Sequence, residues 1–504
     1  MHSSAPEPPA RPRVIVIGGG IAGLAAAARL SGADGSTPSA SVTLIEAATR
    51  LGGKLRSGEL EGIPVDLGAE SMLARRPEAV TLARAVGLGP ALQPPATAKA
   101  AIWTRGALRP MPTGHLMGVP GDLDALAASG VVSPEGMARI AEDLTLDYAA
   151  AAAADPAGPA DSAAPAAPAA IEGDDVAVGA YIGARLGREV VERLVEPLLG
   201  GVYAGHADQL SLRAAVPQLL PLARRGGSLI EGVRAIQRAA PANPAPVFQG
   251  IDGGIGRLPL AVADACRAAG VELRLGTEVR SLRRTADGWS VRATSAIGTE
   301  ELTADAVVLA VPAPVAARLL AATAPAASAE LAAVEYAGMA LVTLAFQRSD
   351  LGPLSGSGFL VPPVDRRAIK ASTFSSNKWG WLAAAAPDSF VLRTSVGRHG
   401  EEQDLDLDDA ELVARSLRDL GTAAGIAAAP YASTVTRWRG GLPQYPVGHL
   451  DRVARIGRLT AELPGLALCG AAYQGVGIPA CIASGWRAAD LVTGALAAEG
   501  RMSA

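Results

Sequence analysis

The sequence has few cysteines and histidines, and this scarcity excludes two kinds of site. Its three cysteines, Cys266, Cys469 and Cys481, are too few for a disulfide framework and lack metal-ligand spacing, which indicates a reducing compartment. Its five histidines show no HExxH motif or comparable spacing. We therefore predict neither a structural disulfide nor a metal centre.

Strong net charge and long apolar runs are also lacking. The formal net charge is −4, and without a basic excess nucleic acid is excluded as a partner. No stretch reaches the roughly 18 consecutive apolar residues of a membrane-spanning helix. Residues 1–12 are proline-rich and have no apolar core of a signal peptide, so we interpret them as a disordered tail. We predict a cytoplasmic protein, and composition leaves open a loose attachment to a membrane surface.

A dinucleotide-binding turn follows almost at once. Residues 14–30, VIVIGGGIAGLAAAARL, give a β-branched run, a glycine turn and an alanine-rich helix. In this GxGxxG pattern the first glycine permits the tight turn, the second lets the backbone approach a pyrophosphate, and the third lets helix pack on strand. The first amides of the helix then face the phosphates. We assign to this phosphate site Gly18, Gly20, Ile21, Ala22 and Gly23.

The residues after the second strand distinguish between cofactors. Glu46 ends the strand SVTLI, where a carboxylate accepts hydrogen bonds from ribose hydroxyls and disfavours a 2′-phosphate. The segments EAATRLGGKLRS and VDLGAES add glycines and positive charge that a nicotinamide enzyme does not need. A longer, permanently held cofactor would use them, which favours FAD. The cofactor-binding residues predicted here are Ala47, Arg50, Gly52, Gly53, Lys54, Gly68, Ala69, Glu70 and Ser71.

A second dinucleotide site is not indicated. The stretch GIDGGIGRL, residues 250–258, lacks the GxGxxG spacing, and no acid follows at the ribose position of the next strand. We interpret it as the turn that enters a helix. Electrons would then come from a substrate rather than NADPH, and molecular oxygen is the simplest acceptor.

Taken together, these motifs and the C-terminal CGAAYQGVGIPACIASGWRAA resemble the flavin amine oxidase superfamily. Within it, the stretches DLGAESMLARRPEAVTLARAVGLG, VERLVEPLLGGVYAG and RWRGGLPQYPVGHL are similar to the oxygen-dependent porphyrinogen oxidases of haem synthesis, and the first and last are the most specific. The resemblance implies FAD, with Val279 meeting the adenine through its backbone and Trp438 shaping the pocket wall and flavin contact. It places along the flavin Gly470, Val476, Gly477 and Ile478.

The resemblance also implies an activity. Its water-soluble bacterial branch oxidises coproporphyrinogen III to coproporphyrin III, removing six electrons and releasing three hydrogen peroxide molecules; protoporphyrinogen IX is the other substrate of the family. The flavin carries the chemistry, so we predict no catalytic side chain. The substrate bears propionates, for which basic residues are the natural partners. We expect this role for Arg75, Arg76 and Lys378.

The predicted fold is α/β, with a Rossmann-type FAD-binding domain assembled from residues 13–88, 216–300 and 431–504. A helical subdomain is expected over 89–215, with an Ala/Pro-rich insertion at 149–170, and an α+β substrate-binding sheet domain over 301–430. The sequence leaves open whether the helical subdomain touches a membrane surface or passes product to a chelatase.

Three other functions are alternatives to porphyrinogen oxidation. An amine oxidase would carry an aromatic cage at the flavin, yet the C-terminal turn here has Ile478 and Pro479. A phytoene-type desaturase would leave Arg75 and Arg76 without a purpose. A non-enzymatic escort protein of the same fold would have lost the cofactor, whereas the phosphate turn and Glu46 are intact.

Overall fold

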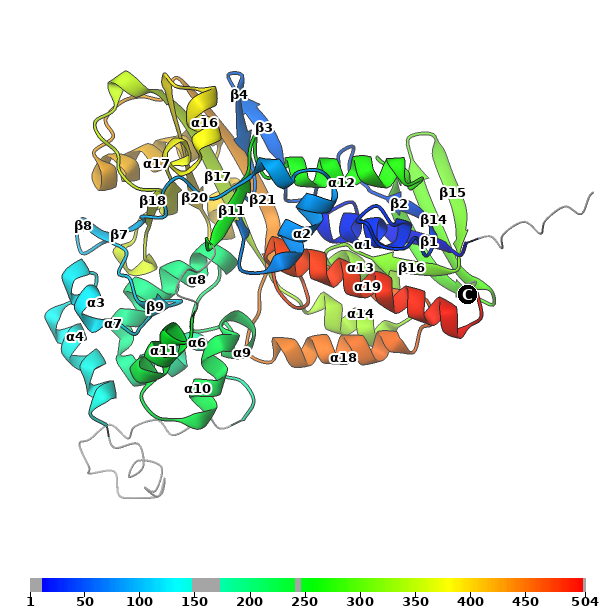
Figure 1. Cartoon of the computed structure of the whole chain (residues 1–504), viewed down its shortest axis with the longest axis horizontal. Coiled ribbons are helices and arrows are strands. Elements are labelled where there is room, and N and C mark those ends of the chain that lie inside the picture. Colours follow the sequence, from blue (N-terminus) through cyan, green and yellow to red (C-terminus); the bar gives the residue numbers. More distant parts are fainter. Residues whose placement is uncertain (1–10, 147–172, 241–245, 502–504) are drawn as a thin grey trace, which may run out of the picture.

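The computed structural model describes residues 11–146, 173–240 and 246–501. Most of the predicted tail and the whole Ala/Pro-rich insertion at 149–170 lie outside these ranges. Figure 1 shows a nucleotide-type α/β region that contains the described chain ends, a second region built on a large sheet, and a helical region below that sheet. Within the described ranges, none of the helices combines the length and apolar character that a membrane crossing requires.

The α/β region is built on a parallel five-stranded sheet of order β12-β2-β1-β16-β22. After Arg13 every residue of β1 is buried, as expected of a strand covered on both faces. The strands come from distant parts of the chain, which confirms a Rossmann-type domain assembled from separated segments. β16 belongs to this sheet, although the sequence division placed it in the sheet domain. The strands are β1 (Arg13–Ile17), β2 (Ser41–Ile45), β12 (Glu272–Arg274), β16 (Ala306–Leu309) and β22 (Leu466–Leu468).

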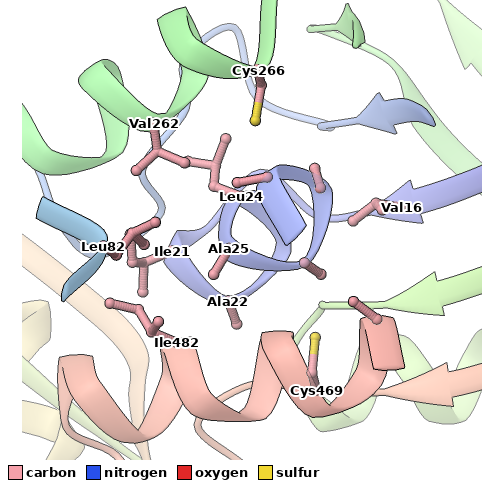
Figure 2. Close-up of a cluster of buried hydrophobic side chains, with 14 of the residues drawn as sticks. Val16, Ile21, Ala22, Leu24, Ala25, Leu82, Val262, Cys266, Cys469 and Ile482 are labelled. Atoms are coloured by element: carbon pink, nitrogen blue, oxygen red, sulfur yellow. The ribbon is translucent and has the colours of Figure 1, made fainter. Parts of the chain in front are cut away.

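Helix α1 (Ile21–Ser31) lies at the centre of this region and is almost entirely buried. Figure 2 shows its side chains between Val262 of α12 (Arg257–Ala268) and Ile482 of α19 (Ile478–Ala498). The alanines of α1 let the neighbouring helices approach it closely, because their side chains are small. The first and last helices of the chain therefore share one core.

A smaller antiparallel sheet, β13-β14-β15, shares a second core with the parallel sheet and the helices behind it. Trp289 is buried there and donates from Nε1 to the Pro464 carbonyl oxygen at 3.1 Å. The elements are β13 (Glu278–Thr285), β14 (Gly288–Ser295), β15 (Gly298–Ala304), α13 (Ala313–Leu320), α14 (Pro325–Ala332) and α18 (His449–Ala461).

The second region is a seven-stranded sheet of order β21-β17-β20-β19-β18-β7-β8. Its neighbouring strands are antiparallel except for the parallel pair β18–β7, and α17 (Asp409–Ala424) contributes to the core on one face. β7 and β8 join its edge, although the sequence division placed them in the helical subdomain. The strands are β7 (Ala101–Thr104), β8 (Ala107–Pro110), β17 (Tyr336–Gln347), β18 (Gly358–Leu360), β19 (Ile369–Thr373), β20 (Ser389–Val396) and β21 (Ala432–Pro443).

The helical region has its own apolar core, which also includes Tyr445 from the segment after β21. A fully buried ion pair, Arg185 Nη2 to Asp143 Oδ1 at 3.0 Å, lies inside it. The region extends through Arg238, whereas the sequence division ended it at residue 215. Its helices are α3 (Leu123–Ser129), α4 (Pro134–Ala141), α6 (Val178–Leu186), α7 (Arg188–Val190), α8 (Glu196–Tyr203), α9 (Leu212–Ala215), α10 (Leu220–Arg225) and α11 (Leu229–Arg238).

Short elements connect the three regions around the candidate site. The hairpin β3–β4 leads into β5, and β11 then pairs with both β5 and β6. These elements are β3 (Ser57–Leu60), β4 (Ile63–Asp66), β5 (Met72–Leu73), α2 (Pro77–Ala85), β6 (Leu92–Gln93), β9 (His115–Leu116), β10 (Val119–Pro120), β11 (Phe248–Ile251), α15 (Ser375–Lys378) and α16 (Gly380–Ala385).

Candidate functional site

The glycine turn after β1 has two glycines that packing requires and one that faces open space. At Gly18, with φ +113°, a Cβ would lie 2.4 Å from the Ala310 carbonyl oxygen, and at Gly23 a Cβ would lie 1.9 Å from the Gly18 oxygen. At Gly20 a Cβ would meet nothing within 4 Å among the described residues. Gly18 and Gly23 therefore close the strand–helix joint, and Gly20 leaves room for a ligand beside the backbone.

Helix α1 begins at this turn without a side-chain cap. Its N-cap is Gly20, and Ile21, Ala22 and Gly23 form the first turn. The amides of Ala22 and Gly23 have no acceptor within the described protein, and the helix dipole adds positive potential. This arrangement suits a phosphate group.

Glu46 lies at the same edge, because β1 and β2 are parallel and pair Ile17 with Ile45. Its carboxylate accepts hydrogen bonds from the Gly19 amide at 2.6 Å and the Ala48 amide at 2.8 Å, across the exposed Ala47. The Thr277 amide donates to the Glu46 carbonyl oxygen at 3.0 Å. This contact brings the start of β13, with the buried Val279, next to Glu46, as an adenosine site requires.

The segment 50–54 folds against the phosphate turn. The Gly52 amide donates to the Gly19 oxygen at 2.8 Å, and Arg50 Nη2 donates to the Gly53 oxygen at 2.8 Å. Lys54 is the unusual member, since burial lowers the pKa of its amine and no carboxylate of the described chain lies within 4 Å. A buried ammonium without an anion is costly, so this position suits an anionic part of a ligand.

The backbone of residues 66–70, which we call the flavin-side segment, contacts segment 50–54. At Gly68 a Cβ would lie 2.0 Å from the Lys54 carbonyl oxygen and 3.4 Å from the Trp438 ring. Trp438 Nε1 donates to the Leu67 oxygen at 2.9 Å, so this side chain supports the segment directly. The amides of Gly68, Ala69 and Glu70 make no hydrogen bond to described protein atoms, and they remain candidate donors to a cofactor with the neighbouring Ser71.

The side chain of Glu70 faces the sheet region and is buried between two cations. Lys378 Nζ lies 2.6 Å from Glu70 Oε1, and Arg393 Nε lies 3.1 Å from Glu70 Oε2. Although burial favours protonation, these charges hold the pKa of Glu70 below its ordinary value. Lys378, predicted to bind substrate, thus has its charge balanced within the protein, and no sequence motif indicated Arg393.

The two arginines after β5 differ in their surroundings. Arg75 is exposed and makes no ion pair with the described residues. Arg76 Nη2 lies 2.6 Å from Glu78 Oε1 at the start of α2. Arg75 is therefore the freer of the two for a carboxylate of a ligand.

The C-terminal motif brings a second uncapped helix to the site. Gly477 is the N-cap of α19 without a side-chain cap, and the buried Ile478 begins the helix. At Gly470, with φ +125°, a Cβ would meet nothing within 4 Å of the described chain. Val476 packs against the core of the helical region, which joins that region to the site. At Gly485 a Cβ would lie 2.2 Å from the Ala22 oxygen, so α19 crosses α1 at backbone contact.

Tyr445 and His449 support the C-terminal turn, residues 470–477, through contacts with its backbone. Their rings stack at 3.9 Å, and the Gly475 amide donates to the Tyr445 hydroxyl at 2.8 Å. His449 Nε2 lies 3.1 Å from the Tyr473 carbonyl oxygen, and burial lowers the pKa of His449 to about 4. Both residues therefore hold the backbone of the C-terminal turn.

The stretch 250–258 is the helix-entry turn that was predicted. α12 begins at Arg257, and the Asp66 carboxylate accepts from the Ile255 amide at 2.9 Å and the Gly256 amide at 3.2 Å. Burial raises the pKa of Asp66 to about 6. A cavity of about 10 Å³ beside Asp66 is lined by Glu70 and Arg393 among others.

These features fit a bound FAD: open space at Gly20 and Gly470, two uncapped helix N-termini, amides at 68–70 with no acceptor among the described atoms, and Lys54, whose ammonium lies over the Tyr336 ring and has no carboxylate of the described chain within 4 Å. Residues 21–493 match the family of flavin-containing amine oxidoreductases. The chain is 37% identical over 486 residues to a coproporphyrinogen III oxidase of Mycobacterium tuberculosis, covering 96% of this chain and 98% of that protein. It is 32% identical over 482 residues to the coproporphyrinogen III oxidase of Bacillus subtilis, covering 94% and 96%.

A solved structure from Exiguobacterium sp. 255-15, named for protoporphyrinogen oxidase, superposes with a TM-score of 0.80 at 33% identity. The match covers 96% of this chain and 99% of that one. The similarity to porphyrinogen oxidases and the prediction of FAD are thereby confirmed. The chain belongs to the family of flavin-containing amine oxidoreductases.

Proposed function

We propose that this chain oxidises coproporphyrinogen III to coproporphyrin III with bound FAD and molecular oxygen. The observation that carries the proposal is the 37% identity over 96% of the chain to a curated coproporphyrinogen III oxidase. The reaction removes six electrons and six protons from the macrocycle in three steps, and three oxygen molecules take them up as three hydrogen peroxide molecules. When bound, the flavin supplies the two-electron acceptor for each step and passes the electrons to oxygen.

The residues of the chain position the two reactants. The α1 N-terminus and Lys54 would bind the anionic phosphates, Glu46 the ribose, and the amides of 68–70 and the α19 turn the flavin end. Because Asp66, Glu70 and Lys378 are already paired with protein groups, they fix the site rather than react.

Substrate recognition falls to the arginines before α2. Coproporphyrinogen III carries four carboxylates, and a guanidinium binds a carboxylate in a bidentate manner. Arg75 is exposed and unpaired within the described chain, whereas Arg76 must share its charge with Glu78. We therefore expect Arg75 to contribute more to substrate affinity than Arg76. Cytoplasmic location remains a prediction from the sequence.

The test is an aerobic assay of the purified flavoprotein with coproporphyrinogen III, protoporphyrinogen IX and a simple amine in parallel. We expect porphyrin fluorescence to grow with three peroxides per coproporphyrin formed. Consumption of the amine while coproporphyrinogen III stays unchanged would overturn the proposal. Faster turnover of protoporphyrinogen IX would correct the substrate but keep the reaction.

Variants then test the role of the arginines. Arg75→Ala should raise KM for coproporphyrinogen III about 10-fold or more, since a hydrogen bond to a charged group contributes about 1.5–3 kcal/mol. Bound flavin should stay at the wild-type level. Arg84→Ala, which removes an exposed arginine of α2, the helix that follows Arg75, is the matched control. Equal KM values for the two variants would remove Arg75 from substrate recognition.

A further inference from the structure

Three successive carbonyl groups of the flavin-side segment are held by the seven-stranded sheet. Arg393 Nη1, from β20, donates to the Gly68 oxygen at 2.7 Å and to the Asp66 oxygen at 3.3 Å. Trp438, from β21, donates to the Leu67 oxygen between them at 2.9 Å. The segment is therefore fixed by side chains that lie more than 300 residues away in the sequence.

Arg393 has a second role in the same place. Its Nε lies 3.1 Å from Glu70 Oε2, and Lys378 Nζ lies 2.6 Å from Glu70 Oε1. The Arg393 side chain is only 13% exposed and the Glu70 side chain 5%. One guanidinium thus binds both ends of the segment, two carbonyls by one nitrogen and the carboxylate by another. An ammonium group, with its donors on one atom, cannot reproduce this geometry.

We propose that Arg393 is a positioning residue that sets the place of residues 66–70 against the flavin. The inference rests on the proposed function only in that this segment contacts the cofactor. The backbone at Gly68 has little room to move, since it lies between the Lys54 oxygen and the Trp438 ring. A shift of the segment therefore moves the free amides of 68–70 and changes their hydrogen bonds to the bound cofactor.

The test compares Arg393→Lys with Arg348→Lys. Arg348 also donates to two carbonyls, Pro387 at 2.9 Å and Ser389 at 3.2 Å, but it does so at the outer end of the same strand. Both variants keep a positive charge and lose one forked contact. The measurements are flavin content, the visible absorption bands, the flavin midpoint potential, and kcat and KM for coproporphyrinogen III.

We expect Arg393→Lys to retain flavin but to shift its bands and potential, and to lower kcat about 10- to 100-fold with KM little changed. Arg348→Lys should match the wild type. Identical spectra, potential and kcat in both variants would overturn the proposal. If Arg393→Lys does not fold, Glu70→Gln is measured instead, because it removes the negative charge that pairs with Arg393 and replaces glutamate with a side chain of nearly the same size. A wild-type potential and kcat in Glu70→Gln would then refute it.

The failure of this inference is distinguishable from failure of the proposed function. The absorption bands and the potential are measured on the bound flavin without substrate. If the wild type does not oxidise coproporphyrinogen III, the function is wrong, while the spectral comparison still decides the role of Arg393.

Discussion

Gly485 is the position where one added methyl group should push apart α1 and α19, the two helices whose N-termini we expect to bind the cofactor. In an ordinary helix interior, Gly→Ala stabilises by about 0.5–1 kcal/mol. In α19 the added Cβ would lie 2.2 Å from the Ala22 oxygen and 3.1 Å from the Ala26 amide nitrogen. Both atoms belong to the backbone of α1, which has no side-chain rotamer with which to make room.

The magnitude follows from that distance. The helices have to part by about 1 Å for the contact to approach ordinary van der Waals separation. Overpacking of this kind costs about 1–3 kcal/mol, which exceeds the gain in helix propensity and leaves a net loss of about 1–2 kcal/mol. The N-termini of α1 and α19 move apart with it. Loss of one hydrogen bond to a charged phosphate is worth about 1.5 kcal/mol, so FAD should bind about 10-fold more weakly.

The assay pairs Gly485→Ala with Gly494→Ala in the same helix, where a Cβ meets nothing within 4 Å of the described chain. Thermal unfolding is followed by tryptophan and flavin fluorescence in one sample, and FAD affinity by titration of the apoprotein. Gly494→Ala should unfold at or above the wild-type temperature with unchanged FAD affinity. If Gly485→Ala behaves in the same way, the close crossing of α1 and α19 is not what holds the site together.

Two further predictions concern carboxylates of the candidate site. Glu46→Ala removes the acceptor of the Gly19 and Ala48 amides, so flavin content after desalting should fall at least about 10-fold. The control Glu59→Ala, at an exposed position of β3, should retain the flavin. Equal flavin content in the two variants would contradict the ribose assignment. Burial raises the pKa of Asp66 from 3.8 to about 6, so the folded state binds the proton more tightly and the wild type loses stability, up to about 3 kcal/mol, as pH rises from about 4 to about 6. The asparagine of Asp66→Asn does not ionise. In urea titrations, the free energy of unfolding of the variant minus that of the wild type should therefore be higher at pH 7 than at pH 4. The same value of this difference at both pH values would refute the prediction.

The phosphate end of the site could be predicted because its geometry is local. A strand, three spaced glycines and a helix specify their own turn, and Glu46 follows on the adjacent strand. The second glycine pair and the distant C-terminal turn could also be found, since each places a glycine beside a helix or strand end. Gly485 could not, because only the crossing of α19 with α1 shows that its missing Cβ is required.

Charge pairing was the part that sequence patterns could not supply. Lys378 was a candidate for substrate binding, but nothing local indicates that Glu70, 308 residues earlier, neutralises it. Arg393 stands in an ordinary strand pattern, and its partners lie in another region of the fold. The domain boundaries differ for a related reason: β16 and β7 are recruited to sheets far along the chain. Pairing between distant segments depends on tertiary packing, which the hydrophobic periodicity of the sequence does not reveal.

The flavin-side segment is where these distant pairings meet. Asp66 caps the turn before α12, Gly68 contacts Lys54, and Glu70 is held by the sheet. The segment thus connects the α/β region, the glycine turn and the seven-stranded sheet through five residues of backbone. Because interiors are close-packed and transmit displacements, a change in the sheet reaches the cofactor through this segment first. Substitutions in β20, such as Arg393→Lys, should therefore alter the flavin through this segment, whereas substitutions in the helical region act through other contacts, among them those of Val476 and Tyr445.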